Sequence, residues 1–381
     1  MKFSWFFVIF PVFVFLYSCL NYYTGHWISE YFFGSRHARL ISLIFVAIGL
    51  LSFNVMRLRH VSDSLFKEIL RFAGFSWMGS VLIAATVLML CSLAFFILKK
   101  FSFDIPLPVR AYLPAALFLI CLASAFYNGF RQPSIKRFEI FSSKIPQELD
   151  GYKIAHLSDI HLDSKRKMRD FRRTMENVNS EKPDIVLISG DIIDPGVDES
   201  SDSDDYFKSL KAKDGVFACL GNHEYYFGLE KSIALLRRMG IALLHNESAE
   251  IDGIRITGLG DISTEQISAE AASAAAGRNP DMPEIVLSHQ PLHYDAFAEK
   301  NVMLVLSGHT HRGQIFPFNL LTRLKYHYFY GRYAIKDTEF YVTSGTGSWG
   351  PRMRFLASPE IVLITLRRHS ADEMEGADLP D

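Results

Sequence analysis

Five short polar motifs follow apolar runs after residue 150 of this 381-residue chain. Each motif begins where an apolar run stops at a small residue, and each supplies carboxylate, imidazole or carboxamide groups. The motifs are Asp159-Ile160-His161, Asp191-Ile192-Ile193-Asp194, Asn222-His223-Glu224, His289 and His309-Thr310-His311. Short apolar runs bounded by polar clusters predict buried strands. Ligands bind at the carboxyl ends of strands in open α/β sheets, so we expect the five motifs to converge on one crevice.

The chemistry of such a crevice follows from its donors, which are two carboxylates, four imidazoles and one carboxamide. These predicted ligands are Asp159, His161, Asp191, Asn222, His289, His309 and His311. A mixture of oxygen and nitrogen donors without thiolate suits Mn, Fe or Zn better than Ca or a sulfur site. Seven donors exceed one tetrahedral zinc ion but suit two ions that share a carboxylate. Two cations about 3.5–4 Å apart stabilise the attacking and leaving oxygens of phosphoryl transfer.

The spacing within the motifs also makes a local prediction. Asp159 and His161 are two residues apart, so an extended backbone would place both side chains on one face, and His309 and His311 repeat this spacing. Glycines precede three of the motifs, at positions 190, 221 and 308. We expect these glycines to let the backbone turn sharply beside the ions.

Taken in this order, the motifs resemble the calcineurin-like metallophosphoesterase family over about residues 150–367. Each motif is short, and their order makes the resemblance specific. Three later stretches resemble the bacterial membrane-anchored branch of that family: Gly308–Gln314, Tyr341–Arg354 and Pro359-Glu360. The resemblance implies a layered α/β domain in which two sheets are flanked by helices. It also implies two divalent metal ions.

The same resemblance implies roles for individual residues. Asp159, His161, Asp191 and His311 would hold one ion, and Asp191 would bridge to a second ion held by Asn222, His289 and His309. Attack on phosphorus would come from a metal-bridged hydroxide, and the catalytic residues would be Asp191 and His223, the latter as the acid for the leaving oxygen. Asp194 and Glu224 match positions behind the ligands, with Glu224 expected to orient His223.

These roles predict hydrolysis of a phosphoester or a pyrophosphate in a phosphorylated small molecule or a lipid-linked substrate. The resemblance includes membrane enzymes that cleave the pyrophosphate of an acylated UDP-sugar. The alternative from a different class is a membrane sensor or scaffold whose metal site binds without turnover. Metal content together with turnover of an aryl phosphodiester separates the two.

Several other residues are candidates with a plainer alternative. Guanidinium groups pair bidentately with phosphate, so arginines near the motifs are candidate substrate ligands, although each can equally be a surface residue: Arg312, Arg332, Arg352 and Arg354. The aromatic stretch 316–330 is interpreted as a lipid-facing lip of the site or as a buried loop. Isolated side chains are predicted to be surface, core or loop residues rather than ligands: His156, His245, His293, Asp163 and Asp261.

Charge is distributed unevenly along the chain. Residues 1–130 carry 10 Lys and Arg against 4 Asp and Glu, whereas residues 131–381 carry 30 against 37. Hydrophobic residues make up 49% of the chain and aromatic residues 14%. This contrast excludes a single soluble globule and a disordered chain. Since the water-soluble part is acidic, we expect no nucleic-acid partner.

The first third predicts a transmembrane domain with four helices. Its uncharged apolar runs are Phe3–Leu20, Leu40–Met56, Phe72–Leu98 and Ala111–Phe130. A helix needs roughly 20 such residues to cross the hydrocarbon core. A cleaved signal peptide is the alternative for the first run, because Leu16–Cys19 resembles a poor lipoprotein cleavage site. Membrane lipid is therefore an expected partner.

Basic residues predict the orientation of these spans. With the N-terminus inside, inner segments carry nine Lys and Arg and outer loops carry five. Lys99 and Lys100 count against this arrangement. The balance predicts a multi-pass protein of the cell inner (plasma) membrane with a cytoplasmic catalytic domain.

Beyond the spans, strand-like and helix-like stretches alternate, which is typical of an α/β protein. The expected helices are Lys167–Ser180, Leu229–Met239, Glu265–Ala276 and Pro291–Lys300. The expected strands are Tyr152–Leu157, Asp184–Ile188, Val216–Leu220, Ile241–Leu244, Ile285–Leu287, Val302–Leu306, Phe340–Val342 and Ile361–Leu366, with a hairpin at Ile251–Leu259. The expected domains are a transmembrane domain at 1–130, a linker and first strand at 131–150, the metallophosphoesterase domain at 151–368 and an acidic tail at 369–381.

Overall fold

The computed structural model describes residues 6–54, 65–277, 279 and 282–368. The chain divides into two units, which we call the helical unit and the α/β unit. The helical unit comprises residues 1–130 together with two later segments, Ile315–Pro317 and Gly350–Leu356. The α/β unit comprises the rest of the chain. The predicted tail at 369–381 lies outside the described residues.

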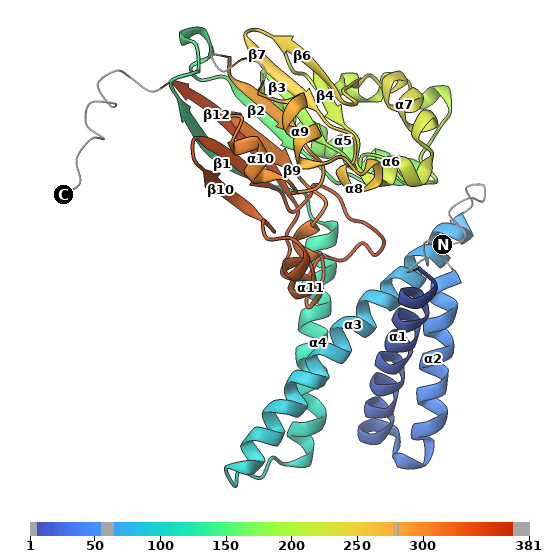
Figure 1. Ribbon diagram of the computed structural model, residues 1–381. Coiled ribbons are helices and arrows are strands. Elements are labelled where there is room, and N and C mark those ends of the chain that lie inside the picture. Colours follow the sequence, from blue (N-terminus) through green and yellow to red (C-terminus); the bar gives the residue numbers. More distant parts are fainter. Residues whose placement is uncertain (1–5, 55–64, 278, 280–281, 369–381) are drawn as a thin grey trace, which may run out of the picture. The chain divides into compact units, whose positions relative to one another are not determined.

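Long apolar helices make up most of the helical unit (Figure 1). They are α1 (Phe6–Ile28), α2 (Ala38–Asn54), α3 (Leu65–Lys100) and α4 (Leu107–Phe130), with short turns at Ser29–Phe33 and Ser35–His37. Within the described residues, three stretches are long and apolar enough to cross a membrane: Ser35–Asn54, Phe66–Lys100 and Leu107–Phe130. They correspond to the last three predicted runs. The first predicted run begins outside the described residues, so the count of four passes stays a prediction.

Two segments that follow the phosphoesterase motifs in sequence pack among these helices. Ile315 and Met353 form a buried apolar cluster with Ile83 and Val87 of α3 and Ala125 of α4. The segments also pair with each other, because the backbone N–H of Phe316 donates to the carbonyl of Phe355 at 3.2 Å. The helical unit is therefore completed by chain from the second half of the sequence.

Glycines permit the closest of these approaches. A Cβ at Gly129 of α4 would lie 2.3 Å from the carbonyl oxygen of Arg352, and one at Gly79 of α3 would lie 2.7 Å from Met353 Sδ. The backbone N–H of Arg354 donates to the carbonyl of Ala125 at 2.8 Å. A larger residue at position 129 would displace the backbone at Arg352, whereas one at position 79 would require the Met353 and Ile315 side chains to shift.

Two six-stranded sheets form the α/β unit. The first has the order β1-β12-β2-β3-β4-β5 and the second β10-β11-β9-β8-β7-β6. The strands of the first sheet are β1 (Ser134–Ser142), β12 (Glu360–Arg368), β2 (Lys153–Leu157), β3 (Ile185–Ser189), β4 (Val216–Cys219) and β5 (Ala242–Leu243). Those of the second are β10 (Gly331–Ile335), β11 (Thr338–Val342), β9 (Leu304–Ser307), β8 (Glu284–Leu287), β7 (Ile254–Gly258) and β6 (Glu247–Ile251).

Successive side chains of each strand point to opposite faces of its sheet, and this alternation produces the layers of the α/β unit. In β3, Ile185 and Leu187 point between the two sheets, where they meet Ile285 and Leu304 of the second sheet. The intervening residues of β3 point outward and pack beneath helices α5 (Lys165–Ser180) and α7 (Leu229–Arg238). The outer face of the second sheet packs beneath α9 (Ala269–Ala275) and α10 (Tyr294–Ala298). The expected fold of two sheets flanked by helices is confirmed.

Strand pairing determines where the polar motifs lie. Within the first sheet β2, β3, β4 and β5 run parallel to one another, and within the second sheet β7, β8, β9 and β11 do so. The carboxyl ends of parallel neighbours meet at one edge of their sheet.

Some elements differ from the sequence-based expectation. The helix expected at Glu265–Ala276 is divided into α8 (Ile262–Glu265) and α9, because Gln266 between them is left-handed with φ 56°. Two helices and one strand were not expected: α6 (Asn222–Phe227), α11 (Phe318–Lys325) and β10. The residues expected as a linker and first strand include β1, which pairs in parallel with β12.

Candidate metal centre

The five polar motifs come from strands of both sheets. Asp159 and His161 follow β2, Asp191 and Asp194 follow β3, and the Asn222 motif follows β4. His289 follows β8, and His309 and His311 follow β9, both in the second sheet. Most of these side chains are buried. Sheet topology thus brings donors that are far apart in sequence to one place.

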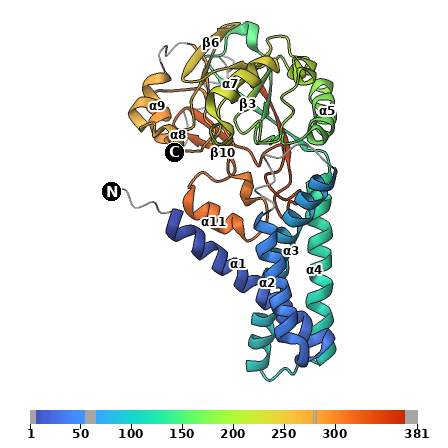
Figure 2. The same ribbon diagram turned by 90° about the vertical axis from the view of Figure 1, so that its right-hand side faces the viewer.

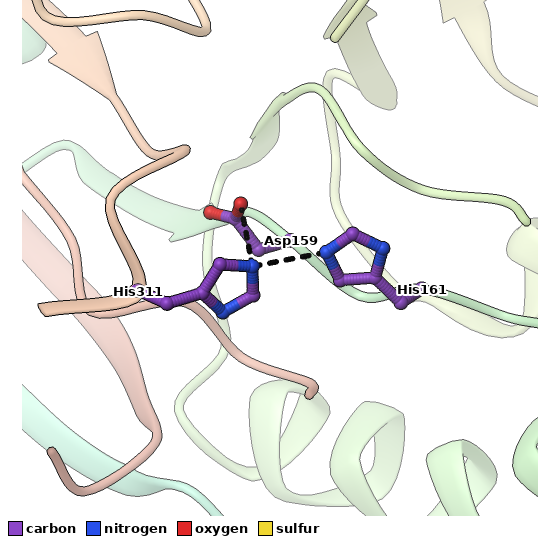
Figure 3. Close-up of side chains that lie close together, drawn as sticks. All are labelled: Asp159, His161 and His311. Atoms are coloured by element: carbon purple, nitrogen blue, oxygen red, sulfur yellow. Dashed lines mark hydrogen bonds and ion pairs between the residues drawn. The ribbon is translucent and has the colours of Figure 1, made fainter. Parts of the chain in front are cut away.

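One group of donors joins the two sheets (Figure 3). His161 and His311 face each other with Nε2 atoms 3.0 Å apart, and His311 Nε2 lies 3.2 Å from Asp159 Oδ1. Ligand atoms bound at 2.0–2.2 Å to one ion lie about 3.0–3.4 Å from one another. The Asp159, His161 and His311 donors therefore have the spacing of a shared cation site, and the same three residues form a possible metal-holding group.

A second group lies around Asp191. His289 Nε2 is 3.2 Å from Asp191 Oδ2 and 3.2 Å from His309 Nδ1. The Asn222 carboxamide adds its Oδ1 at 2.9 Å from His309 Nδ1. Asp191, His289 and His309 also form a possible metal-holding group. Both groups contain only oxygen and nitrogen donors, so each has a composition that suits Mn, Fe or Zn.

Asp191 lies between the two groups. Its Oδ2 is 3.2 Å from His289 Nε2 in one group and 3.8 Å from His161 Nε2 in the other. Burial alone would raise the pKa of this carboxyl, but His289 and then His223 stabilise the carboxylate and hold its pKa far below the usual range. Asp191 is thus ionised and reachable from both sides.

The Asp194 carboxylate is hydrogen-bonded to the Nδ1 atoms of two imidazoles. Its Oδ2 lies 3.1 Å from His161 Nδ1, and its Oδ1 is hydrogen-bonded to His223 Nδ1. A carboxylate behind a histidine fixes the tautomer and turns the other ring nitrogen inward. The His161 Nε2 consequently faces His311, and the His223 Nε2 faces Asp191 at 3.9 Å.

The Glu224 carboxylate contacts backbone groups of the site. Its carboxylate accepts four backbone N–H groups, from Gly221, Asp191, Ile192 and Ile193, at 2.8–3.1 Å. The sequence expectation placed Glu224 behind His223, whereas the side chain bonded to the His223 ring is Asp194. Burial and the Asp191 carboxylate raise the pKa of Glu224 to about 7, a rise that the backbone N–H groups oppose. Glu224 therefore fixes the loop that carries Asp191.

The ligand backbone is not extended as the two-residue spacing suggested. Asp159, His161, His309 and His311 all have positive φ, between 47° and 67°, and Asp191 has φ 52°. The expectation of alternating side chains on an extended segment was wrong, because each of these residues is left-handed. Non-glycine residues in this region cost about 1–3 kcal/mol each and cluster at functional sites. The surrounding hydrogen bonds hold them, as where the His309 N–H donates to both Asp159 oxygens at 3.0 Å.

The three motif glycines act in two ways. Gly190 turns the chain as expected, with φ +82°. A Cβ at Gly221 would lie 2.2 Å from Asp191 Oδ1, and one at Gly308 would lie 2.3 Å from Asp159 Oδ2. Gly221 and Gly308 are outside the positive-φ set, so they provide space for the carboxylates and not a sharp turn.

Electrostatics in the centre couple imidazoles to carboxylates. Burial lowers the pKa of a histidine, but Asp191 overcomes it and raises the pKa of His289 to about 10. Asp191 and Asp194 likewise raise the pKa of His223 to about 9. Burial and the neighbouring His289 instead lower the pKa of His309 to about 3. Protons and cations compete for the same carboxylates here, so metal binding would release protons.

The candidate arginines lie in different surroundings. The Arg332 guanidinium makes a bidentate pair with Glu339 at 2.8 Å for both bonds. Arg352 and Arg354 lie in the segment that packs in the helical unit, with Arg352 over the Phe130 ring. Arg312 directly follows the ligand His311, and its guanidinium lies over the Tyr330 ring at 4.4 Å.

The residues expected outside the ligand set have other partners. His156 Nε2 is bonded to Ser189 Oγ at 2.8 Å, and His293 to the carbonyl of Ile267 at 3.0 Å. His245 pairs with Glu265. Asp163 pairs with Lys167 at 3.0 Å. Asp261 caps α8 through Thr264 and accepts from Gln290.

The sequence reasoning missed Tyr326 and two aromatic neighbours of His223. The Tyr326 hydroxyl lies 2.8 Å from His309 Nε2, on the side of the ring opposite Asn222. If a cation binds His309 Nδ1, then Nε2 would carry the proton and donate to the Tyr326 oxygen. The rings of Tyr226 and Trp349 flank His223 at 5.3 and 6.1 Å. The aromatic composition of 316–330 was the one available signal for Tyr326.

Comparisons with known proteins agree with this geometry. The sequence matches the calcineurin-like phosphoesterase family over residues 152–313. An uncharacterized metallophosphoesterase of Helicobacter pylori is 37% identical over 246 residues, which cover 63% of this chain and 66% of that protein. One of Campylobacter jejuni is 33% identical over 256 residues, covering 66% and 68%. A Danio rerio protein named transmembrane protein with metallophosphoesterase domain is 34% identical over 257 residues, covering 63% and 59%.

This chain belongs to the calcineurin-like metallophosphoesterase family. The match spans just under two thirds of the length of the Helicobacter relative. Together with relatives named transmembrane proteins, the three apolar helices make the chain a membrane protein.

Proposed function

We propose that this chain is a membrane-bound phosphoesterase with two divalent cations, Mn, Fe or Zn, at the centre described above. Asp159, His161, Asp191 and His311 would hold one cation. Asp191, Asn222, His289 and His309 would hold the other. The observation that carries the proposal is the position of Asp191 Oδ2, 3.2 and 3.8 Å from imidazoles of the two groups. The donor set fits, since one carboxylate has lone pairs for both sides.

Two bound cations would supply Lewis acidity to a phosphoryl oxygen and make water nucleophilic at neutral pH. His223 supports the reaction from the protein side. Its Nδ1 is bonded to Asp194, which leaves Nε2 as the atom that can give a proton to the leaving oxygen. Asp191 and Asp194 together raise the pKa of His223, and this favours the protonated imidazole that a general acid needs. General acid help of this kind contributes about 10²–10⁴-fold.

The substrate is proposed to be a phosphorylated small molecule or a lipid-linked phosphoester or pyrophosphate. Membrane attachment of the chain supports the lipid-linked class. Arg312 is the proposed phosphate ligand, because Arg332 is already paired with Glu339 and Arg352 packs on α4. The Tyr226 and Trp349 rings beside His223 are suited to an apolar or aromatic leaving group.

The placement in the membrane is also a proposal. With four spans, the N-terminus and the α/β unit share the cytoplasmic side of the plasma membrane, as the balance of basic residues predicts. A reporter fused after Asp381 that is active only in the cytoplasm supports this orientation. Activity only outside would contradict it, and would mean either an odd number of spans or an N-terminus outside.

Turnover of bis(4-nitrophenyl) phosphate by the purified full-length protein tests the proposed function. We expect chelation to remove activity and Mn, Fe or Zn to restore it. His289→Ala should abolish turnover, whereas His293→Ala, whose ring bonds only the Ile267 carbonyl in the described structure, should not. Full metal occupancy without turnover of any phosphoester or pyrophosphate would instead support a sensor or scaffold.

A further inference from the structure

The short helix α11 (Phe318–Lys325) carries an apolar stripe on its surface. Leu320, Leu321 and Leu324 are 53%, 59% and 85% exposed. At 3.6 residues per turn these three side chains fall within about 100° of the helix circumference. Figure 2 shows α11 as a separate helix outside the sheets of the α/β unit. Adjacent large aliphatic side chains exposed in this way mark an interaction face.

The charge around this stripe points to a lipid surface. Arg323 and Lys325 occupy the last turn of α11 and are exposed. Between Glu299 and Asp337 the sequence contains no acidic residue. A helix with leucines on one side and basic residues beside them binds anionic headgroups and buries its apolar face at the acyl boundary.

Chain connectivity limits how far α11 can lie from the helical unit. The helix begins at the residue after Pro317, and Ile315–Pro317 belongs to the helical unit. Ile315 itself packs in a cluster with Ile83, which lies in Phe66–Lys100, a stretch long and apolar enough to cross a membrane. At 1.5 Å per helical residue, Leu324 lies within about 12 Å along the chain of that segment.

Both ends of α11 are attached to the loop that carries the metal-site histidines. A Cβ at Gly313 would lie 2.3 Å from Asn319 Cα, so the first turn of α11 packs directly on the backbone after His311. Beyond the helix, Tyr326 bonds His309 Nε2, and Thr310 Oγ1 donates to the carbonyl of Phe329 at 2.9 Å. The position of α11 and the position of the metal centre are therefore linked.

We propose that α11 lies in the interfacial layer of the bilayer that holds the chain's own helices. Leu320, Leu321 and Leu324 insert at the acyl boundary, and Arg323 and Lys325 bind lipid phosphates. The loop that carries His309 and His311, which α11 contacts, would then lie near the lipid headgroups and their phosphates. The docking itself does not depend on turnover at the metal centre.

Depth-dependent fluorescence tests this docking in the full-length protein. Leu324→Cys is labelled with an environment-sensitive dye in a Cys19→Ser, Cys91→Ser, Cys121→Ser background, since the remaining Cys219 is buried. The protein is reconstituted in vesicles of phosphatidylcholine and phosphatidylglycerol with lipids spin-labelled near the headgroup or deep in the chain. Thr322→Cys, on the opposite side of the same helix, is the matched control.

We expect blue-shifted emission at position 324 and stronger quenching by the shallow spin label than by the deep one, with little quenching at position 322. Leu321→Cys should repeat the result of position 324. Water-like emission at positions 321 and 324 would overturn the proposal. Blue-shifted emission without lipid quenching would also overturn it, because protein would then cover the stripe. The readout does not involve activity, so failure of the proposed hydrolase function leaves this test intact.

Discussion

Glu224→Gln tests how the loop that carries Asp191 is held. The parent carboxylate is fully buried and accepts four backbone N–H groups, two at each oxygen. Glutamine has nearly the same shape, but its NH₂ replaces one oxygen and faces two N–H donors. Each buried donor left without an acceptor costs about 1–3 kcal/mol, so the expected loss of stability is about 2–6 kcal/mol.

The assay is the thermal unfolding of purified full-length protein, with metal content measured on the same samples. For a domain of this size 1 kcal/mol corresponds to about 2–4 °C, so the unfolding temperature should fall by at least about 4 °C. Bound metal should fall as well, because Asp191 belongs to the released loop. Glu230→Gln, an exposed change of the same chemistry on α7, should shift stability by no more than about 0.5 kcal/mol.

Parental stability and metal content in Glu224→Gln would refute this role. A variant that is stable and fully loaded, but slow only with a poor leaving group, would instead support the role predicted from the sequence, in which Glu224 orients His223.

Three further changes give separate tests. His223→Ala should keep both metals and lose about 10²–10⁴-fold in turnover of an alkyl phosphoester, with a smaller loss for a 4-nitrophenolate leaving group; loss of metal would make it a ligand. Tyr326→Phe should weaken metal binding about 10–100-fold in a chelator titration, whereas Tyr328→Phe should not, and equal affinities would contradict the bond to His309. Burial lowers the pKa of His156 to about 3, against about 6.5 in an unfolded chain. The unfolded chain therefore binds a proton that the folded one does not, and stability is lost as pH falls from 6.5 toward 3, by up to about 1.4 kcal/mol per unit. His156→Gln should flatten the decline in unfolding temperature over that range, and an unchanged decline would contradict this account.

The convergence of the motifs could be predicted because it follows from topology. Strands that are buried on both faces give short apolar runs, and parallel strands direct their carboxyl ends to one edge. These two rules bring Asp159, Asp191 and Asn222 to one edge of the first sheet, and His289 and His309 to one edge of the second. The packing of the two sheets then brings His161 to His311 and Asp191 to His289. The family resemblance then assigned each donor to one of the two expected ions, with Asp191 bridging them.

Local backbone conformation at the site could not be predicted from spacing. A spacing of two residues predicts side chains on one face of an extended segment. The backbone of both His309 and His311 is instead left-handed. Tertiary hydrogen bonds, such as those from the His309 N–H to Asp159, stabilise this conformation. One signal was present and overlooked, since Gly-Asn-His-Glu places a glutamate at the third helical position, where it can accept the N–H before the helix.

Contacts that depend on long loops had no local signal. Tyr326 reaches His309 only because the chain turns back after α11, and Arg332 is removed from the candidate phosphate ligands by Glu339 on the neighbouring strand. The return of Ile315–Pro317 and Gly350–Leu356 to the helical unit was also not anticipated. Their packing depends on complementary shape at Gly79 and Gly129, which composition does not encode.

Metal stoichiometry in the parent and in Asp191→Ala tests the central claim most directly. The parent should bind two equivalents of Mn, Fe or Zn by elemental analysis. The variant should lose both, because each cation would share this carboxylate, and the exposed change Asp202→Ala should keep both. An Asp191→Ala protein that is folded and still binds two equivalents would contradict a binuclear centre bridged by Asp191.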